Sequence, residues 1–229
     1  MIGHTLTVLV VVAAVSDASV KTEGKCAGVT SGDVLGPYYK PNAPLRPSGP
    51  NVPHLCENLP NNFRIFLNGT VRMADASGSC GSGRPVKALL DIWQADNNGE
   101  YGNISPSSPD YSCRARMYTD NKGFYSFSTI YPGRYDDGGY RPSHIHYKIT
   151  PVNANNKPIG ESLVTQVYFT GDYYLSPRDS CGRCGSGQPS QIVHVENIYD
   201  IQTFVGSWDI LLKQRSNKNA GLGDITVYN

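Results

Sequence analysis

From Phe63 onward the sequence consists of short apolar or alternating runs, each closed by turn residues. The turns are rich in Asp, Asn and Gly, as in Asp96–Gly99 and Asp120–Gly123, and these residues favour tight turns. Several short strands at close spacing are typical of an antiparallel sandwich or barrel. We therefore predict an all-β fold, an antiparallel β-sandwich with long loops, over residues 63–229. The expected strands are Phe63–Met73, Val86–Gln94, Gly123–Ile130, His144–Thr150, Leu163–Phe169 and Phe204–Leu212.

The residues before this region predict a leader and an arm. Leu6–Val15 is an apolar run too short to span a bilayer, and Ser16-Asp17-Ala18 has the small-x-small pattern that signal peptidase cleaves. The first residues lack the Lys or Arg that usually begins a signal peptide, and a buried N-terminal strand is the alternative. We expect residues 1–18 to be a signal peptide of a secreted protein with no membrane segment in its mature form. Residues 19–62 are rich in Pro, Gly and Asn, which predicts an extended N-terminal arm.

Cysteine usage agrees with an oxidising compartment. All 6 cysteines follow the expected leader, so three disulfides are expected, with the pairing left open. Cys181-Gly-Arg-Cys184 is also a possible zinc or redox motif, but the chain has no second copy of it, which favours a structural disulfide. The remaining cysteines are Cys26, Cys56, Cys80 and Cys113. Asn68 and Asn103 each begin a glycosylation sequon.

Charge is balanced, with 20 Lys plus Arg against 19 Asp plus Glu. No basic stripe stands out along the chain. The charge pattern therefore argues against a nucleic-acid partner.

The segment Arg141-Pro-Ser-His144-Ile-His146 carries the clearest chemical signal. Side chains two apart on a strand point to the same face, so His144 and His146 can both reach one metal ion. Imidazole pairs suit zinc, copper, nickel and iron, and many such pairs are ordinary strand residues. Asp136 or Asp137 would complete a site for zinc or ferrous iron, so the residues alone leave the metal open.

Tyrosine is abundant, with 15 copies. Tyr101 ends the segment Asp91–Tyr101, and Tyr135 lies nine residues before His144. An aromatic on a sheet face is the ordinary role for any one of them. Composition alone therefore assigns neither residue to a site.

Taken together, these segments resemble the intradiol ring-cleavage dioxygenases, the family of catechol and protocatechuate dioxygenases. The resemblance extends over roughly residues 30 to 170 and includes several motifs in the family's order. The secretory leader and the cysteines are similar to the secreted fungal and arthropod branch. The matching segments are Gly36-Pro-Tyr-Tyr39, Asp91–Tyr101, Thr119–Tyr135, Arg141–His146 and Leu163–Phe169.

The resemblance implies one non-haem iron(III) per chain. Carried over by position, its ligands are Tyr101, Tyr135, His144 and His146. Phenolates are hard anionic donors suited to ferric iron, and a bound cation lowers the pKa of a phenol from its usual value near 10.

The resemblance also implies the reaction and the residues around the metal. A catechol would bind iron through both oxygens and displace Tyr135, which takes a substrate proton, and O2 would then open the ring to a cis,cis-muconate-type diacid. Arg141 matches the family's active-site arginine, which stabilises negative charge on the ring. Tyr38, Trp93 and Gln166 are expected to bind substrate or support the ligands.

The chain departs from bacterial members after Tyr135, where Asp136 and Asp137 replace a common tryptophan and the stretch to His144 is shorter. We expect a more open and polar mouth, and with it a broad range of small catechols. No long helical region precedes the domain, so a monomer is expected. A secreted β-sandwich protein that binds catecholates or metal without turnover is the alternative function.

Overall fold

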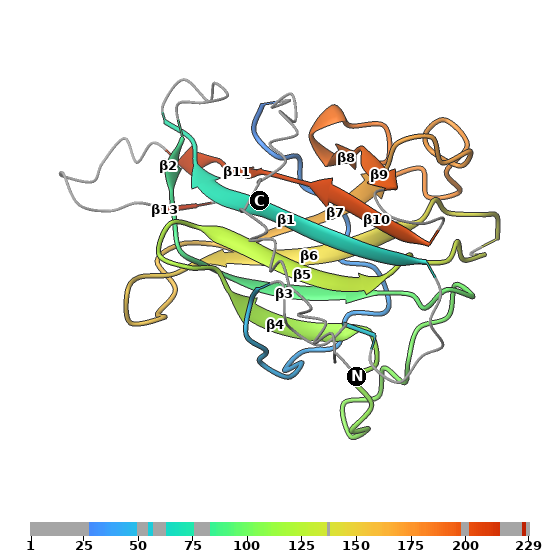
Figure 1. The fold of residues 1–229 in the computed structure, drawn as a ribbon, viewed down its shortest axis with the longest axis horizontal. Helices are drawn as coiled ribbons and strands as arrows, with labels where there is room; N and C mark the ends of the chain where they lie inside the picture. The colour runs from blue at the N-terminus through green and yellow to red at the C-terminus, as the bar shows by residue number, and fades with distance from the viewer. Residues whose placement is uncertain are drawn as a thin grey trace, which may run out of the picture.

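The computed structural model describes residues 28–49, 55–56, 63–75, 83–136, 138–197, 202–215 and 226–227. The predicted all-β fold is confirmed, because two β-sheets pack face to face as a sandwich (Figure 1). Within these ranges the helical structure is one 3-10 turn, η1 (Pro189–Gln191). No helix in the described part is long and apolar enough to cross a membrane.

One sheet is built around the long strand β1 (Arg64–Met73), and the other around β6 (His144–Pro151). The first sheet also contains β2 (Arg84–Pro85), β5 (Phe124–Ile130), β9 (Val195–Asn197), β10 (Thr203–Ser207) and β11 (Ile210–Leu212). The second has the order β4 (Arg114–Tyr118), β3 (Ala88–Gln94), β6, β7 (Leu163–Phe169), β8 (Ile192–Val193). Two further strands, β12 (Gln214–Arg215) and β13 (Thr226–Val227), pair with each other.

All six expected strand regions form strands, but β2, β4, β8, β9, β12 and β13 were not expected. Two further differences concern how the expected strands are arranged. Phe204–Leu212 is not one strand but β10 and β11, separated by Trp208 and Asp209. At this point side chains take part in the bonding: the Tyr125 hydroxyl donates to Trp208 O, and Thr70 N donates to Asp209 Oδ1. The sheets are also mixed, since β1 pairs in parallel with β10 and β11, and β7 pairs in parallel with β8. Hairpin turns predict the antiparallel neighbours, but they carry no information about strands that return from far along the chain.

The apolar core lies between the two sheets. Side chains alternate along each strand, so every second residue of β1 is buried, and Ile145, Tyr147 and Ile149 of β6 belong to the same core cluster. His144 and His146 alternate with these residues, so they project from the opposite face of the second sheet. This outer face carries the candidate site.

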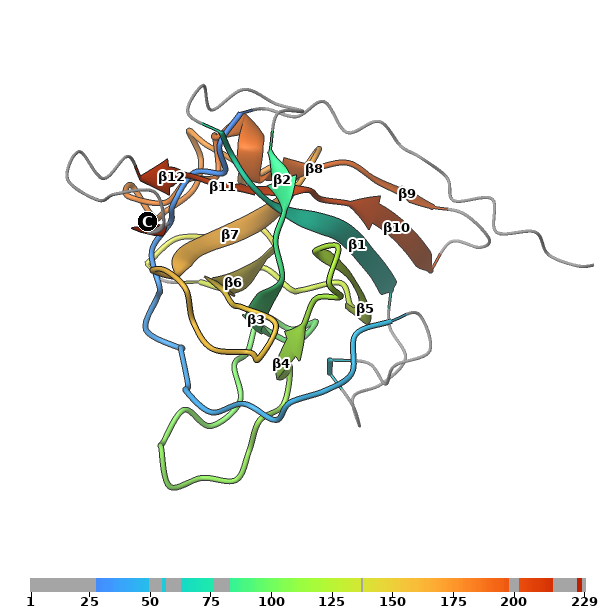
Figure 2. The same cartoon turned by 90° about the vertical axis from the view of Figure 1, so that its left-hand side faces the viewer.

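The arm segment 28–49 runs along the outside of the sandwich (blue in Figures 1 and 2). Its backbone bonds to both sheets: Thr30 N donates to Leu211 O at 2.9 Å, and Asp33 N donates to Val164 O at 2.9 Å. Farther along, Arg46 N donates to Arg116 O at 2.7 Å. The arm therefore crosses the second sheet and is hydrogen-bonded to it near both ends.

Two disulfides join described residues, Cys56–Cys113 and Cys181–Cys184. The second confirms a disulfide, not a metal motif, at the Cys-x-x-Cys segment. Cys26, Cys80 and the proposed leader lie outside the described residues.

Candidate metal centre

Strand register places the candidate residues in a row across the outer face of the second sheet. Trp93 of β3 lies opposite His146 of β6, and His146 lies opposite Gln166 of β7. His144 lies opposite Tyr168 on the same face. Directly opposed side chains on one face touch, so the pairing of three strands brings these groups together.

The two imidazoles point at each other. The Nε2 atoms of His144 and His146 are 3.2 Å apart. His144 Nδ1 lies 2.7 Å from the carbonyl oxygen of Pro142, which can only accept, so Nδ1 carries the proton and Nε2 carries the lone pair. The Trp93 ring stacks on His146, with centroids 4.8 Å apart and 7° between planes, which fixes that ring's orientation.

Both histidines are neutral at neutral pH. Burial, followed by the charge of Arg141, lowers the pKa of His144 to about 3. Burial and the neighbouring His144 likewise hold the pKa of His146 well below its usual value. Neutral imidazole is the form that binds a metal ion.

The two tyrosines come from loops that pack against each other. Tyr101 follows the turn after β3, and Tyr135 follows β5. Gly133 N donates to Asp96 O at 2.7 Å, and a Cβ at Gly99, whose φ is 86°, would meet the Arg134 carbonyl. This close approach leaves the Tyr101 and Tyr135 rings 5.7 Å apart.

The Tyr101 hydroxyl is buried and has no hydrogen-bond partner. Burial, followed by the nearby Tyr135, raises the pKa of Tyr101. An unpaired buried hydroxyl costs free energy. A bound cation would remove that cost by converting the hydroxyl to a charged ligand.

The Arg141 guanidinium lies next to the Tyr135 hydroxyl and the His144 ring. Its Nη1 lies 3.4 Å from the Tyr135 hydroxyl and 3.4 Å from His144 Nε2. Its Nη2 donates to Gln166 Oε1 at 3.2 Å and to the Tyr168 hydroxyl at 3.1 Å. Burial alone would lower the pKa of Arg141, but the hydrogen bond to Asp179 and other contacts raise it above its ordinary value, so the charge is fixed.

The arm completes the site. Gly36 has a φ of 74°, and a Cβ there would lie 3.2 Å from His146 Cε1. Two residues later, the Tyr38 ring stacks on Tyr101, with centroids 4.4 Å apart. The structure thus gathers all the residues expected from the sequence: Tyr38, Trp93, Tyr101, Tyr135, Arg141, His144, His146 and Gln166.

Lys40 and Asp179 are site-supporting residues that the sequence did not identify. Lys40 is buried, and its Nζ donates to the carbonyls of Asn103, Ser108 and Asp110 at 3.1, 2.7 and 2.8 Å, which fastens the loop after Tyr101. Asp179 pairs with Arg141. The position of Lys40 beside the Gly-Pro-Tyr-Tyr segment was an available signal, whereas nothing in the sequence links Asp179 to Arg141.

The carboxylate alternatives find no support in the described residues. Asp136 is exposed and accepts a hydrogen bond from Gly139 N at 2.8 Å, and Asp137 lies outside the described residues. His194 is 68% exposed at its side chain. Within the described ranges no group of three His, Cys, Asp or Glu could hold a metal ion, so a site here must use other donors.

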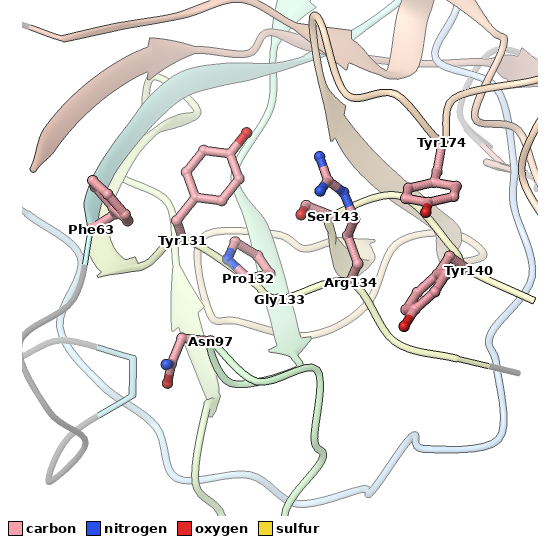
Figure 3. A pocket seen from close by; sticks show the side chains of 9 residues that line it. All are labelled: Phe63, Asn97, Tyr131, Pro132, Gly133, Arg134, Tyr140, Ser143 and Tyr174. Atoms are coloured by element: carbon pink, nitrogen blue, oxygen red, sulfur yellow. The ribbon is translucent and has the colours of Figure 1, made fainter.

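A separate pocket of about 640 Å³ lies beside the centre (Figure 3). None of the four candidate ligands lines it. The side chains of Arg134 and Ser143 lie at its middle in the view, between the rings of Phe63 and Tyr131 and those of Tyr140 and Tyr174. Asn97, Pro132 and Gly133 complete the lining.

Known proteins share this architecture. A family model described as "Dioxygenase" matches residues 34–213. The chain is 33% identical over 189 residues to a chlorocatechol 1,2-dioxygenase of Rhodococcus opacus, covering 75% of this chain and 66% of that one. It is 28% identical over 162 residues to an intradiol ring-cleavage dioxygenase of Aspergillus niger, covering 64% and 47%.

Among solved structures, the dioxygenase domain of a dioxygenase carbohydrate-binding protein fusion from Streptomyces sp. SirexAA-E is similar, with a TM-score of 0.59 and 25% identity. That likeness covers 81% of this chain and 98% of that one. The chain spans about half to two thirds of the length of these curated relatives. With a family match over most of its length and this arrangement of residues, the chain belongs to the intradiol ring-cleavage dioxygenase family.

Proposed function

We propose that this chain is a secreted, iron(III)-dependent intradiol dioxygenase that cleaves catechol-type rings with O2 to cis,cis-muconate-type diacids. One observation carries the proposal. Two neutral imidazoles with Nε2 atoms 3.2 Å apart, a buried unpaired phenol and a second phenol in contact with a fixed guanidinium converge on one point.

The donor set fits ferric iron. Tyr101 and Tyr135 would supply two phenolates, which are hard anionic donors, and His144 and His146 would supply two neutral nitrogens. Two phenolates reduce the charge of a tripositive ion to a single net positive charge, which keeps the desolvation cost of a buried site modest. One iron per chain follows from one such set. When bound, iron(III) would draw electron density from a catecholate and make a ring carbon reactive toward O2.

Tyr135 and Arg141 are the residues placed to act on the substrate. A catechol must lose protons to bind as a catecholate, and the Tyr135 oxygen is the group proposed to accept one of them. Arg141 Nη1, 3.4 Å from that oxygen, would stabilise the negative charge on the ring and on the opened product.

The surrounding side chains hold these groups in place. Trp93 fixes the ring of His146 by stacking, and Gln166 accepts from Arg141 Nη2. Tyr38 covers one face of Tyr101 and keeps water from it.

Substrate range, localisation and assembly form the remaining part of the proposal. Asp136 and Gly138 at the rim are exposed, as is Tyr140, where the sequence lacks the family's bulky wall. This supports a polar mouth that accepts a broad set of small catechols, with O2 as co-substrate. The leader-like residues 1–18 and the two disulfides support secretion. We propose a monomer that binds neither nucleic acid nor membrane in its mature form.

The test is to purify the full chain, measure its metal content and record oxygen uptake with catechol. The expected protein contains one iron per chain, absorbs visible light because tyrosinate is bound to iron(III), and forms a muconate-type product seen by ultraviolet absorbance. A colourless protein with stoichiometric zinc would contradict the iron assignment. Iron and catechol binding without oxygen uptake would contradict turnover and favour a binding protein. A panel of catechol, protocatechuate and plant phenolics then measures the substrate range.

A further inference from the structure

We propose that Asp179 is the positioning residue for Arg141, and that the ring closed by the Cys181–Cys184 disulfide, two residues farther along the chain, holds Asp179 in place. The inference rests on the proposed function, in which Arg141 acts on the substrate. It adds a residue outside the strand motifs to that site.

The contact between Asp179 and Arg141 is bidentate and buried. Arg141 Nε donates to Asp179 Oδ1 at 3.2 Å, and Arg141 Nη2 donates to Oδ2 at 3.4 Å. The two side chains are 2% and 3% exposed. Guanidinium and carboxylate are both planar, so a two-point contact fixes the plane of the guanidinium as well as its position.

That geometry determines which nitrogen faces the reaction. Asp179 takes the edge formed by Nε and Nη2, and Gln166 and Tyr168 also bind Nη2. Nη1 is left to point at the Tyr135 hydroxyl and His144 Nε2. Rotation about the last side-chain bonds would turn Nη1 away, and Asp179 opposes that rotation.

Asp179 stands on a loop, so its own position needs support. Cys181 N donates to Asp179 Oδ1 at 2.9 Å, and Cys184 N donates to Cys181 O at 3.1 Å within the ring that the disulfide closes. Beyond the ring, Gly185 N donates to Asp33 Oδ2 at 2.9 Å. The loop is therefore fastened to the arm on one side and holds the carboxylate through its backbone on the other.

The contact differs from an ordinary surface ion pair. Arg134 and Asp172 form a comparable pair at 3.1 Å, but the Arg134 side chain is 45% exposed, and exposed pairs contribute little. Removing one partner of a buried pair leaves an uncompensated charge. Loss of Asp179 should therefore disturb Arg141 itself.

The first experiment compares Asp179→Asn, Asp179→Glu and the control Glu196→Gln in the iron-loaded full chain. Glu196 is an exposed carboxylate on β9 of the first sheet, whereas the candidate histidines lie on the second sheet. We expect Asp179→Asn to keep the iron content and a KM within about threefold of the parent, while kcat falls on the order of 100-fold, because a misplaced charge no longer meets the transition state. The visible tyrosinate band should shift, since Nη1 leaves the Tyr135 oxygen. Asp179→Glu should restore part of kcat, and Glu196→Gln should match the parent.

A second measurement uses the metal-free protein and does not depend on activity. Unfolding equilibria of Asp179→Asn, Arg141→Met and the double variant form a cycle that isolates the direct interaction. We expect the Asp179→Asn/Arg141→Met variant to be more stable than the sum of the two single effects predicts, by more than roughly tenfold in the unfolding constant.

The Cys181→Ser/Cys184→Ser variant of the iron-loaded protein tests the support of the loop. Its kcat should fall as in Asp179→Asn, but by less.

Parental kcat in Asp179→Asn, or iron loss in proportion to the loss of activity, would overturn the positioning role. Additive unfolding effects would overturn the direct pairing. If the parent protein consumes no oxygen with any catechol, the proposed function fails, and the metal-free cycle still reports on the pair.

Discussion

The ring of Tyr38 lies flat against the ring of Tyr101, with centroids 4.4 Å apart and 11° between their planes. Tyr38 belongs to the arm and Tyr101 to the loop after β3. The contact therefore joins two segments that are distant in sequence, at the one candidate ligand whose hydroxyl is buried without a partner. The arm therefore contributes to the site, in addition to crossing the second sheet.

Replacing Tyr38 tests this role of the arm. Tyr38→Ala removes the stacked ring and admits water to Tyr101, so kcat/KM for catechol should fall roughly tenfold, in line with the free energy of an aromatic pair. Tyr38→Phe keeps the ring and should stay near the parent. Steady-state kinetics with matched iron content measures both. Equal losses in the two variants would mean that the hydroxyl, not the stack, matters.

Loss of a candidate ligand should remove iron. His146→Ala takes away one imidazole, and we expect iron affinity to fall more than roughly 100-fold, beyond the effect of losing a supporting hydrogen bond. Tyr135→Phe should weaken or abolish the visible band and stop turnover. Metal analysis after dialysis against a chelator measures the affinity. His194→Ala, at an exposed histidine, is the control, and iron retention in His146→Ala would refute the ligand assignment.

Gly36 offers a test of how closely the arm approaches the centre. Gly36→Ala places a methyl group 3.2 Å from His146 Cε1 at a φ of 74°, so it should cost stability and also push on the imidazole. Gly171→Ala is the matched control, because its φ is 84° and nothing lies within 4 Å of the added Cβ. Both variants should lose about 1 kcal/mol from the backbone strain. A shifted visible band should appear in Gly36→Ala alone, and its presence in both would contradict the contact.

The raised pKa of Asp91 predicts that the stability of the protein depends on pH. Burial raises the pKa of Asp91 to about 6, although the hydrogen bond from Tyr39 and the charges of Arg116, Lys148 and Arg114 lower it. The folded state then holds a proton that the unfolded state has released, so Asp91's contribution to stability falls as pH rises from about 4 to about 6 and is constant above.

The stability of the Asp91→Asn variant should not show this decrease with rising pH. Urea unfolding at several pH values between 4 and 7 measures the difference from the parent. Tyr39→Phe removes the donor that lowers the pKa of Asp91, so the fall should extend to higher pH. Parallel curves for the parent and Asp91→Asn would show that Asp91 titrates normally.

The two described disulfides should differ in their effect on stability. Cys56–Cys113 closes a loop with a sequence separation of 57, and Cys181–Cys184 closes one with a separation of 3. Loop-closure entropy then predicts a loss of about 4 kcal/mol for the Cys56→Ser/Cys113→Ser variant and about 2 kcal/mol for the Cys181→Ser/Cys184→Ser variant. Denaturant unfolding measures both, and a larger loss at the short loop would contradict this account.

The sequence predicted the parts of the molecule that depend on local pattern. Alternation and turn residues located β1, β3, β5, β6 and β7, because both signals act within a few residues. The same alternation placed His144 and His146 on one face. Trp93 and Gln166 were expected near the site from the family resemblance, and the pairing of their strands with β6 is what places them beside His146.

Other features depend on contacts between distant segments and left no local signal. The parallel partners of β1 return from more than a hundred residues away, and the interruption between β10 and β11 lies where Trp208 O accepts a hydrogen bond from the distant Tyr125. β4 is five residues long, and its Arg114 and Arg116 interrupt the apolar pattern. Asp179 meets Arg141 only because a loop folds back onto the sheet.

The ligands proposed for the metal are scattered over two loops and a strand, with an arm laid over them. No short piece of this chain can therefore assemble the donor set, and the metal-binding free energy becomes part of the free energy of folding. A coloured centre would accordingly report on the native state of the whole sandwich, bleaching when any of its supporting segments detaches.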